Sequence, residues 1–398
     1  MVTDPKKIDE ILNRGTIVEV LPSREDFRQK LIRGEKLKFY IGFDATAPTL
    51  HLSHAKNFML LEKFRQLGHE VIILFGDFTA RIGDPSDRKA ARQQLSAKEV
   101  EANVKKWKEL VEPLMDFKNT SNPPKIMYNS HWLAKMDLEK LLGLASHFTV
   151  QQMLERDMFQ KRLAEGKPIH LHEFLYPLMQ GYDSVAMGVD VEMCGTDQIF
   201  NALAGRTLLK QLSGKDKFVV AVTLMENPKT GELMSKSRGT GVFLNAAPAD
   251  FFGQIMAQPD EMIPILFVNN TFLSLAEIKS LTAGANPRDA KLRLAYEITK
   301  IIHGEKIAQA SQQEFVKVFS QKEKPTEMPV IAIKSGEWPV IDLLSEAKLI
   351  SSKSVGRRLI EQGGVKIDDQ VVKDWQSQVL IKAGTIIQAG KRKFVKIK

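Results

Sequence analysis

The sequence predicts an α/β protein with a doubly wound parallel sheet, followed by a helical region and a small α/β module. Between residue 37 and about residue 224, short apolar runs alternate with segments whose apolar residues recur at helical spacing. The run Val71–Phe75 is apolar throughout and ends at Gly76, which is typical of a strand covered on both faces of a parallel sheet. Beyond Pro248 strand signals fade and helical patterns dominate.

Composition and charge indicate a soluble globular protein with an anionic partner. The 398 residues are 43% hydrophobic and 26% charged, enough for two or three domains. A formal net charge of +9 favours nucleic acid as the partner, although charge alone also fits a protein that is merely soluble. The single cysteine, Cys194, excludes an internal disulfide and favours a reducing compartment. The charged N-terminus is not a secretory signal and no apolar run could span a membrane, so we expect a cytoplasmic protein.

Capping and stop residues support the predicted elements in order. Gly68 ends the first long helix, and Ser96 with Glu99 forms a capping box at the next. The helices over 137–165 carry more apolar residues than one small core needs, so we predict a subunit contact there. The predicted elements are a helical lead-in (1–36), strands at 37–42, 71–75, 125–128, 189–193 and 218–224, and helices at 52–67, 96–117, 137–148, 150–165, 172–188 and 196–212.

The C-terminal third divides into three parts. Helices are predicted from residue 248 to about 319, and the longest begins at Asn286 and ends near Gly304. Residues 321–329 are charged and contain two prolines, which is typical of a linker. The module over 338–398 is predicted to contain a basic helix at 351–362, broken by two glycines, and strands within 365–372.

The stretch from Phe39 to His54 predicts a phosphate site. A strand, a turn and a helix follow one another, with His51 and His54 at the helix start. Unpaired N–H groups and the helix dipole attract anions there, and two imidazoles one turn apart can bond the same anion. Two surface histidines or a zinc-binding pair would leave the same pattern.

Four further motifs carry polar side chains. Residues 234–241 form a glycine-containing loop that could bring Lys236 onto phosphates, or a solvated turn. Tyr176, Gln180 and Asp183 share one helix face, which could line a polar pocket or be an exposed stripe. Gly195-Thr-Asp-Gln lies at a strand-to-helix turn suited to a ribose. In Gly-Asp84-Pro-Ser the carboxylate could pair with an ammonium group or merely form a turn.

Together and in this order, these motifs resemble class I aminoacyl-tRNA synthetases, and among them the bacterial tyrosyl-tRNA synthetases. The resemblance covers essentially the whole chain. It implies a Rossmann-like catalytic domain with a helical insertion (1–245), a helical anticodon-binding domain (246–322) and a ribosomal-protein-like RNA-binding domain (330–398).

The resemblance also implies roles for individual residues, with Thr46, His51, His54 and Lys236 as the catalytic set. Tyr40 and Asp183 match the pair that bonds the tyrosine hydroxyl. The other matches are Asp84, Tyr176 and Gln180 at the α-amino group; Gln198 near the carboxylate; Asp44 beside tyrosine and nucleotide; Thr46 and His51 at the α-phosphate and pyrophosphate; His54 near ribose and adenine; Gly195 and Asp197 at the ribose; and Met234, Ser235, Lys236 and Ser237 in the loop that grips ATP.

The implied reaction joins tyrosine to ATP, supplied with magnesium, and transfers tyrosine from the adenylate to tRNA(Tyr). The tyrosine carboxylate attacks, so side chains supply positioning and charge stabilisation. The resemblance implies a homodimer, with neither a protein-bound metal nor a tightly bound cofactor. The basic residues expected at the tRNA are Lys353, Arg357, Arg358, Lys391, Arg392 and Lys393.

Two positions depart from the family pattern. Ser53 stands where glycine is usual between the two histidines, and Leu233 stands where the first lysine of Lys-Met-Ser-Lys-Ser is usual. They leave room for an RNA-binding paralogue that has lost aminoacylation. A second rival is a synthetase of this class that charges tryptophan, although Tyr40 and Asp183 suit a phenol better than an indole.

Overall fold

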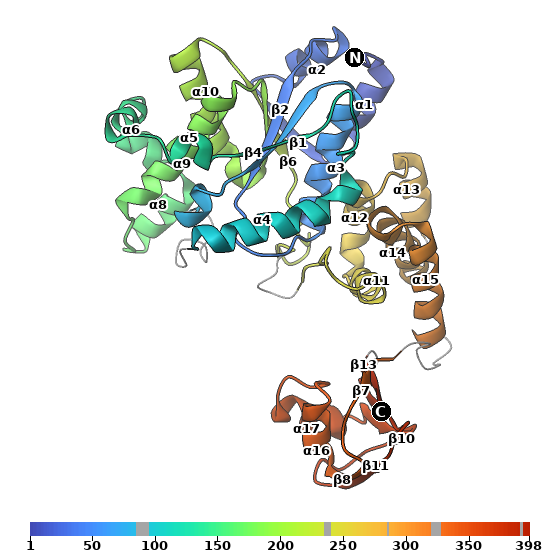
Figure 1. Cartoon of the computed structure of the whole chain (residues 1–398). Coiled ribbons are helices and arrows are strands. Elements are labelled where there is room, and N and C mark those ends of the chain that lie inside the picture. Colours follow the sequence, from blue (N-terminus) through green and yellow to red (C-terminus); the bar gives the residue numbers. More distant parts are fainter. Residues whose placement is uncertain (85–94, 235–239, 285, 320–327, 391–392) are drawn as a thin grey trace. The chain divides into compact units, whose positions relative to one another are not determined.

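Two compact units, Met1–Gln309 and Ala310–Lys398, make up the computed structural model (Figure 1). The structure describes residues 1–84, 95–234, 240–284, 286–319, 328–390 and 393–398. The division between the units falls within helix α15 (Glu305–Phe319). The three domains expected from the sequence, with limits near residues 245 and 322–330, stay a prediction.

A six-stranded sheet in the order β1-β6-β5-β2-β3-β4 forms the centre of the first unit. All neighbouring strands are parallel except β1 and β6, so the predicted doubly wound parallel sheet is confirmed, with an antiparallel strand added at one edge. The chain winds outward in both directions from β2, and ligands of such sheets bind at the carboxyl ends of the central strands. The strands are β1 (Ile17–Leu21), β2 (Lys38–Phe43), β3 (Glu70–Phe75), β4 (Lys125–Tyr128), β5 (Val191–Gly195) and β6 (Phe218–Val222).

Strand β1 shows that the prediction of an all-helical lead-in was wrong. Residues 1–36 contain helices α1 (Pro5–Asn13) and α2 (Arg24–Ile32), but β1 lies between them and pairs with β6. Its Ile-Val-Glu-Val-Leu sequence is rich in β-branched residues, which favour a strand. The charged helices on both sides hide this short run from a periodicity argument.

Successive side chains of β2 contact helices on opposite faces of the sheet. Phe39 stacks on Phe64 of α3 with ring centroids 4.4 Å apart, whereas the hydroxyl of Tyr40 contacts Ser184 of α9. Helices α3 and α9 therefore cover opposite faces (Figure 1). The longer helices of this sheet region are α3 (Leu52–Gln66), α4 (Ala97–Val111), α6 (Leu138–Ala145), α8 (Asp157–Ala164), α9 (Leu171–Met187) and α10 (Ile199–Ser213), and the shorter ones are α5 (Ser130–Leu133) and α7 (Val150–Leu154).

Helices α7 and α8 correct the prediction of one helix over 150–165. The backbone of Arg156 leaves the helical conformation between them, with φ −60° and ψ 126°. Its buried guanidinium lies over the rings of Phe159 and Phe200, at 5.5 and 5.4 Å from their centroids. The break at Arg156 thus divides a segment whose apolar spacing continues.

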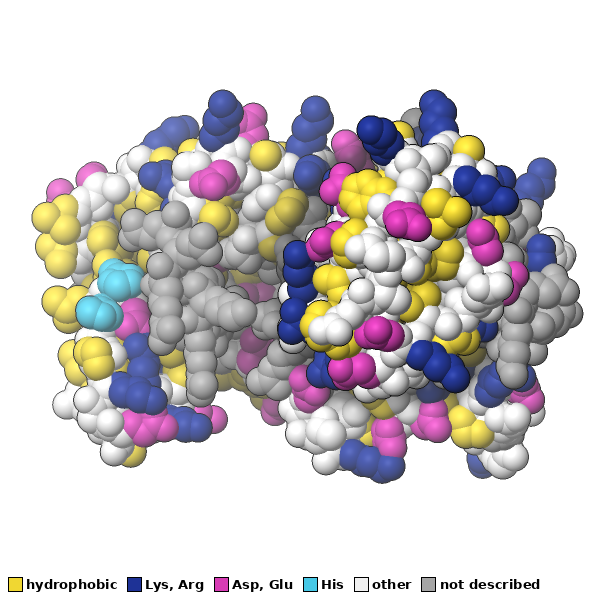
Figure 2. All heavy atoms as spheres, turned by 90° about the horizontal axis from the view of Figure 1, so that it is seen from below, with side chains coloured by type: hydrophobic (Ala, Val, Ile, Leu, Met, Phe, Trp, Pro, Cys, Tyr) yellow, Lys and Arg dark blue, Asp and Glu magenta, His cyan; other side chains and the backbone are white. Residues whose placement is uncertain are grey.

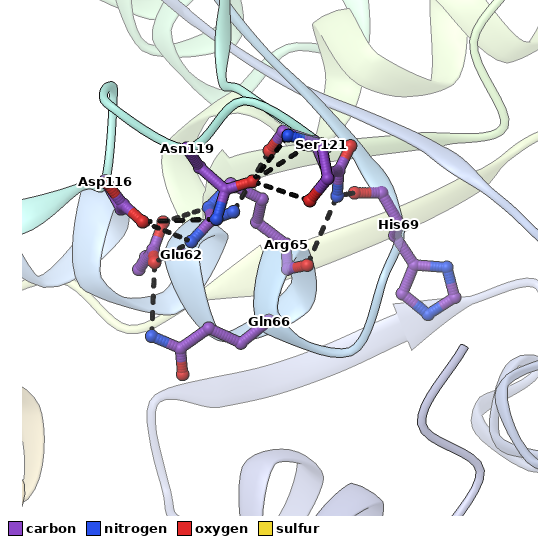
Figure 3. A network of polar contacts seen from close by, with 8 residues as sticks. Glu62, Arg65, Gln66, His69, Asp116, Asn119 and Ser121 are labelled. Carbon is purple, nitrogen blue, oxygen red and sulfur yellow. Dashed lines mark hydrogen bonds and ion pairs between the residues drawn. The ribbon is translucent and has the colours of Figure 1, made fainter.

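The buried side chain of Arg65 ties α3 to the loop before β4 (Figure 3). Arg65 donates two hydrogen bonds of 2.7 Å to Glu62 and one of 3.0 Å to the backbone oxygen of Asn122. Asn122 donates in return to the backbone oxygens of Arg65 and His69. These bonds hold the C-terminal end of α3 against the loop that leads into β4.

The rest of the first unit is helical, and the second unit is a small α/β module, as predicted. The helices are α11 (Pro248–Met256), α12 (Ile263–Asn270), α13 (Leu275–Thr282) and α14 (Pro287–His303). Two sheets, in the orders β10-β9-β12-β13-β7 and β11-β8, pack on two helices around a separate apolar core in the second unit. Its elements are β7 (Val330–Ile331), β8 (Gly336–Pro339), α16 (Val340–Glu346), α17 (Lys353–Glu361), β9 (Val365–Ile367), β10 (Gln370–Val371), β11 (Gln378–Ile381), β12 (Ile386–Ala389) and β13 (Lys393–Ile397).

Candidate active site

Asp44, directly after β2, is the first polar residue at the carboxyl edge of the sheet. Its carboxylate accepts hydrogen bonds from Tyr176 of α9 at 2.9 Å and from Thr79, after β3, at 2.7 Å. A side chain at Gly76 would overlap this carboxylate, so the glycine is needed for close approach. Burial raises the pKa of Asp44 to about 7, and the two hydrogen bonds oppose that rise.

Tyr40 and Asp183 are both buried on the α9 side of the sheet. Asp183 accepts hydrogen bonds from the indole N–H of Trp132, at 2.7 Å, and from Asn129, at 3.4 Å. The hydroxyl of Tyr40 lies 3.0 Å from that of Ser184. Burial raises the pKa of Asp183 and of Tyr40, and for Tyr40 the charges of Glu192 and Asp183 add to it. Sequence reasoning missed Asn129, although its place directly after β4 is the signal that would have found it.

A chain of amides connects Gln180, Gln198 and Asp84. Asn201 of α10 donates to the side-chain oxygens of Gln180, at 2.9 Å, and of Gln198, at 2.8 Å. Gln198 donates to Asp84 at 2.8 Å. The guanidinium of Arg156 lies 3.8 Å from Asp84, and one of its nitrogens is buried without a partner in the described part of the chain. The structure thus brings together residues predicted at the α-amino and carboxylate groups, and adds Asn201 and Arg156, which no local pattern marked.

The two histidines at the start of α3 face each other. Their rings are 4.1 Å apart, and the backbone N–H of His51 donates to Nδ1 of His54 at 3.3 Å. Burial lowers the pKa of His51 to about 4 and that of His54 well below its ordinary value, so both rings are neutral near pH 7. Nδ1 of His51 is buried and has no partner among the described residues. A hydrogen bond from Asn270 to the backbone oxygen of Leu52 fixes this turn.

The ribose and phosphate candidates are described in part. A side chain at Gly195, the last residue of β5, would overlap the carboxylate of Asp197, whose pKa is raised by burial. Thr46 is exposed and Met234 is buried. Ser235, Lys236 and Ser237 lie outside the described residues. Within the described residues no cluster of three His, Cys, Asp or Glu side chains could hold a metal.

Residues 33–320 match the family model described as class I tRNA synthetases (W and Y). The chain belongs to this family. Residues 339–384 match the S4 domain model. Among curated proteins, this class I synthetase is 41% identical to the tyrosine–tRNA ligase of Thermotoga maritima over 99% of its own length and 98% of that protein. It is 40% identical to the tyrosine–tRNA ligase of Moorella thermoacetica over 97% and 94% of the two chains.

Solved structures share the fold of this class I synthetase. A C-terminally truncated mitochondrial tyrosyl-tRNA synthetase from Aspergillus nidulans has a TM-score of 0.67 at 24% identity, over 79% of this chain and 94% of that one. The tyrosyl-tRNA synthetase of Archaeoglobus fulgidus, solved with L-tyrosine, has a TM-score of 0.60 at 19% identity, over 77% and 99% of the two chains. None of the helices in the described residues has the length and hydrophobicity to cross a membrane.

The basic residues expected to contact tRNA lie in the unit that contains the S4 match. Lys353, Arg357 and Arg358 are exposed on α17. Lys353 pairs with Asp342 at 2.7 Å, and Arg357 lies 4.2 Å from the ring centroid of Trp375. Lys393 donates to the backbone oxygen of Leu349 at 2.9 Å, and Lys391 and Arg392 lie outside the described residues.

Proposed function

We propose that this class I synthetase is a cytoplasmic tyrosine–tRNA ligase, and the buried Tyr40–Asp183 pair carries the proposal. A phenol hydroxyl donates one hydrogen bond and accepts another, whereas an indole N–H only donates. Asp183 supplies an acceptor and Tyr40 a hydroxyl, and both are at most 2% exposed. The names of the relatives at about 40% identity over nearly the whole chain agree with this choice.

In the proposed reaction ATP enters as its magnesium complex and the tyrosine carboxylate attacks the α-phosphate. Asp84, Tyr176 and Gln180 hold the α-amino group, and Gln198 lies near the carboxylate. Gly195 and Asp197 receive the ribose. Thr46, His51, His54 and Lys236 stabilise the charge that develops on the phosphates, His51 and His54 as neutral hydrogen-bonding rings rather than as cations.

The proposed enzyme works as a homodimer. Leu138 and Leu142 of α6 are 70% and 60% exposed, and Leu171 at the start of α9 is 83% exposed. Hydrophobic side chains gather on the part of the first unit that holds α6 and α8 (left in Figure 2). Exposed apolar surface of this extent is typical of a subunit contact.

The S4 unit is proposed to bind tRNA(Tyr) through Lys353, Arg357, Arg358, Lys391, Arg392 and Lys393. The exposed cations of α17 support this, because contacts to phosphate dominate RNA affinity. The rival of an inactive RNA-binding paralogue has only Ser53 and Leu233 in its favour. Against it stands the full set of polar groups around Tyr40, Asp44 and Asp183.

Amino-acid-dependent ATP–pyrophosphate exchange tests the proposal. Tyrosine should support exchange, while tryptophan and phenylalanine should not. A site built around a hydroxyl rejects the analogue without it by about ten-thousandfold, and tyrosyl-tRNA synthetases are the standard example of that effect. Asp183→Ala should lose most tyrosine activation, whereas Asp216→Ala, which removes an exposed partner of Arg206, should not. The proposal would be refuted if tryptophan supported exchange and tyrosine did not, or if none of the three amino acids supported exchange.

A further inference from the structure

Two side chains of α4 bind the backbone of the loop that follows β2. The side-chain amide of Asn103 donates to the backbone oxygen of Ala45 at 2.8 Å. One helical turn later, the indole N–H of Trp107 donates to the backbone oxygen of Ala47 at 2.6 Å. Residues four apart in a helix lie on the same face, so one face of α4 holds both oxygens.

Apolar packing fixes the position of α4 against the sheet. The ring centroid of Trp107 lies 6.0 Å from that of Phe43 in β2 and 6.1 Å from that of Phe75 in β3. On the same face of the helix Val100 and Val104 are buried, and Trp107 itself is 3% exposed. The two loop oxygens are thus bonded to a helix that the core holds in place.

Thr46 lies between the two bound oxygens. It is exposed, whereas Ala45 before it is buried and Ala47 after it is half-buried. The backbone N–H of Thr46 donates to the backbone oxygen of Asp44 at 2.8 Å, and the carboxylate of Asp44 is bonded to Tyr176 of α9. Thr46 is therefore an exposed side chain on a backbone that is held on both sides of it.

We infer that Asn103 and Trp107 are positioning residues, which hold the backbone around Thr46 so that its hydroxyl meets the α-phosphate of ATP. The inference rests on the proposed ligase function, in which Thr46 stabilises the charge that develops on the phosphates. Such a group is effective only if it is already in place, and a displacement of about 1 Å can cost about a hundredfold in rate. Asn103 and Trp107 act through Thr46 and touch neither tyrosine nor ATP.

The experiment measures single-turnover formation of tyrosyl-adenylate over a range of tyrosine concentrations at saturating ATP. Asn103→Ala removes one donor, and Trp107→Phe removes the other but keeps an aromatic ring. Each change should slow the reaction by about tenfold, the value of one hydrogen bond, and leave the affinity for tyrosine unchanged. Thr46→Ala alone should slow it at least as much. Added to Thr46→Ala, neither change should slow the reaction further, because the residue through which both act is gone.

Trp338→Phe is the matched control. It removes an indole N–H that also donates to a backbone oxygen, that of Lys334, but in the second unit. The rate of adenylate formation should stay at the parent value. Denaturant unfolding of each variant supplies the other comparison, because a side chain that only stabilised the fold would slow the reaction by the same factor with or without Thr46.

A parent rate in Asn103→Ala, in Trp107→Phe or in Thr46→Ala would overturn the inference. Slowing factors that multiply in the combined variants would also overturn it, since they would show effects independent of Thr46. If Trp107→Phe does not fold, Asn103→Ala decides, because it truncates a half-buried side chain. A parent that forms no adenylate with tyrosine would instead refute the proposed function.

Discussion

Asp44, His51 and Asp183 are ionisable residues whose pKa is moved mainly by burial. The two acids keep a proton to higher pH than they would in water, and the histidine loses its proton at lower pH. For single residues, the consequence of these shifted pKa values is that the stability of the folded state depends on pH in a way that local sequence does not reveal. Asp44 is the best residue for a test, because its pKa of about 7 lies within the range where the protein can be studied.

Asp44 should make the folded state less stable as the pH rises from about 4 to about 7. In the unfolded chain it loses its proton near its ordinary pKa of 3.8, whereas the folded residue keeps the proton up to about 7. Its stabilising contribution is therefore complete below pH 4 and is lost as the pH passes 7. Asp44→Asn should remove this part of the slope in denaturant unfolding measured across that range.

Asp116→Asn is the control for this measurement, since it changes a carboxylate whose side chain is 50% exposed in the same unit. Its pH profile should follow that of the parent. A profile for Asp44→Asn that is parallel to the parent at every pH would contradict the raised pKa.

At the scale of elements, the segment between β6 and α11 differs from the family pattern at Leu233. Residue 233 forms an isolated bridge with Glu226, and its side chain is exposed. Lys229, the nearest described cation, pairs with Glu261 after α11. A lysine engaged in this way is poorly placed to replace a missing phosphate contact.

Lys236→Ala should slow tyrosine activation by about a hundredfold in single-turnover experiments, because a cation beside developing phosphate charge is worth a few kcal/mol. Lys229→Ala should have little effect, and neither variant should change tyrosine affinity much. Leu233→Lys tests the departure itself and should raise the rate or leave it unchanged. Activation at the parent rate in Lys236→Ala would show that this loop does not grip the phosphates.

Helix α6 provides the second element-scale prediction. Leu142→Glu places a charge in the exposed apolar surface of the proposed dimer contact and should yield a monomer by sedimentation or light scattering. Leu212→Glu at the end of α10 changes another exposed leucine, at 47% exposure, and should leave the mass unchanged. A parent that is monomeric, or a Leu142→Glu variant that remains dimeric, would exclude this contact.

At the scale of the whole molecule, the two units have separate cores and are proposed to have separate tasks. The second unit has its own apolar cluster, which includes Val340, Leu344 and Ile387. The proposed tyrosine and ATP residues all belong to the first unit, whereas the basic residues of α17 belong to the second. Chemistry and RNA affinity should therefore be separable.

A chain cut after Phe319 should keep ATP–pyrophosphate exchange and lose most tRNA charging. The full chain should charge tRNA with a steep dependence on salt, because phosphate contacts release counterions. A more selective test replaces Arg357 and Arg358 with Gln in the full chain. This change should weaken tRNA charging and leave ATP–pyrophosphate exchange unchanged. Charging by the cut chain at the full rate would remove the second unit from tRNA binding.

Local pattern was sufficient for much of the fold and for part of the site. Continuous apolar runs such as Val71–Phe75 predicted the parallel strands, and glycines and caps marked the helix ends. The spacing of Tyr176, Gln180 and Asp183 placed them together on one face of α9. In the structure each of these side chains is hydrogen-bonded to a polar side chain of another element. Such patterns succeed because an element's period is determined by its own backbone geometry.

Tertiary structure alone decided the edge strand β1, the break at Arg156 and the partners of the pocket residues. Tyr40 and Ser184 are 144 positions apart, and Lys217 and Glu192 are 25 apart on different segments. No periodicity relates such residues, because their contact depends on strand order, on register and on how closely α9 and α10 approach. A buried charge is also recognisable only once its surroundings are folded, since burial rather than sequence determines whether it needs a partner.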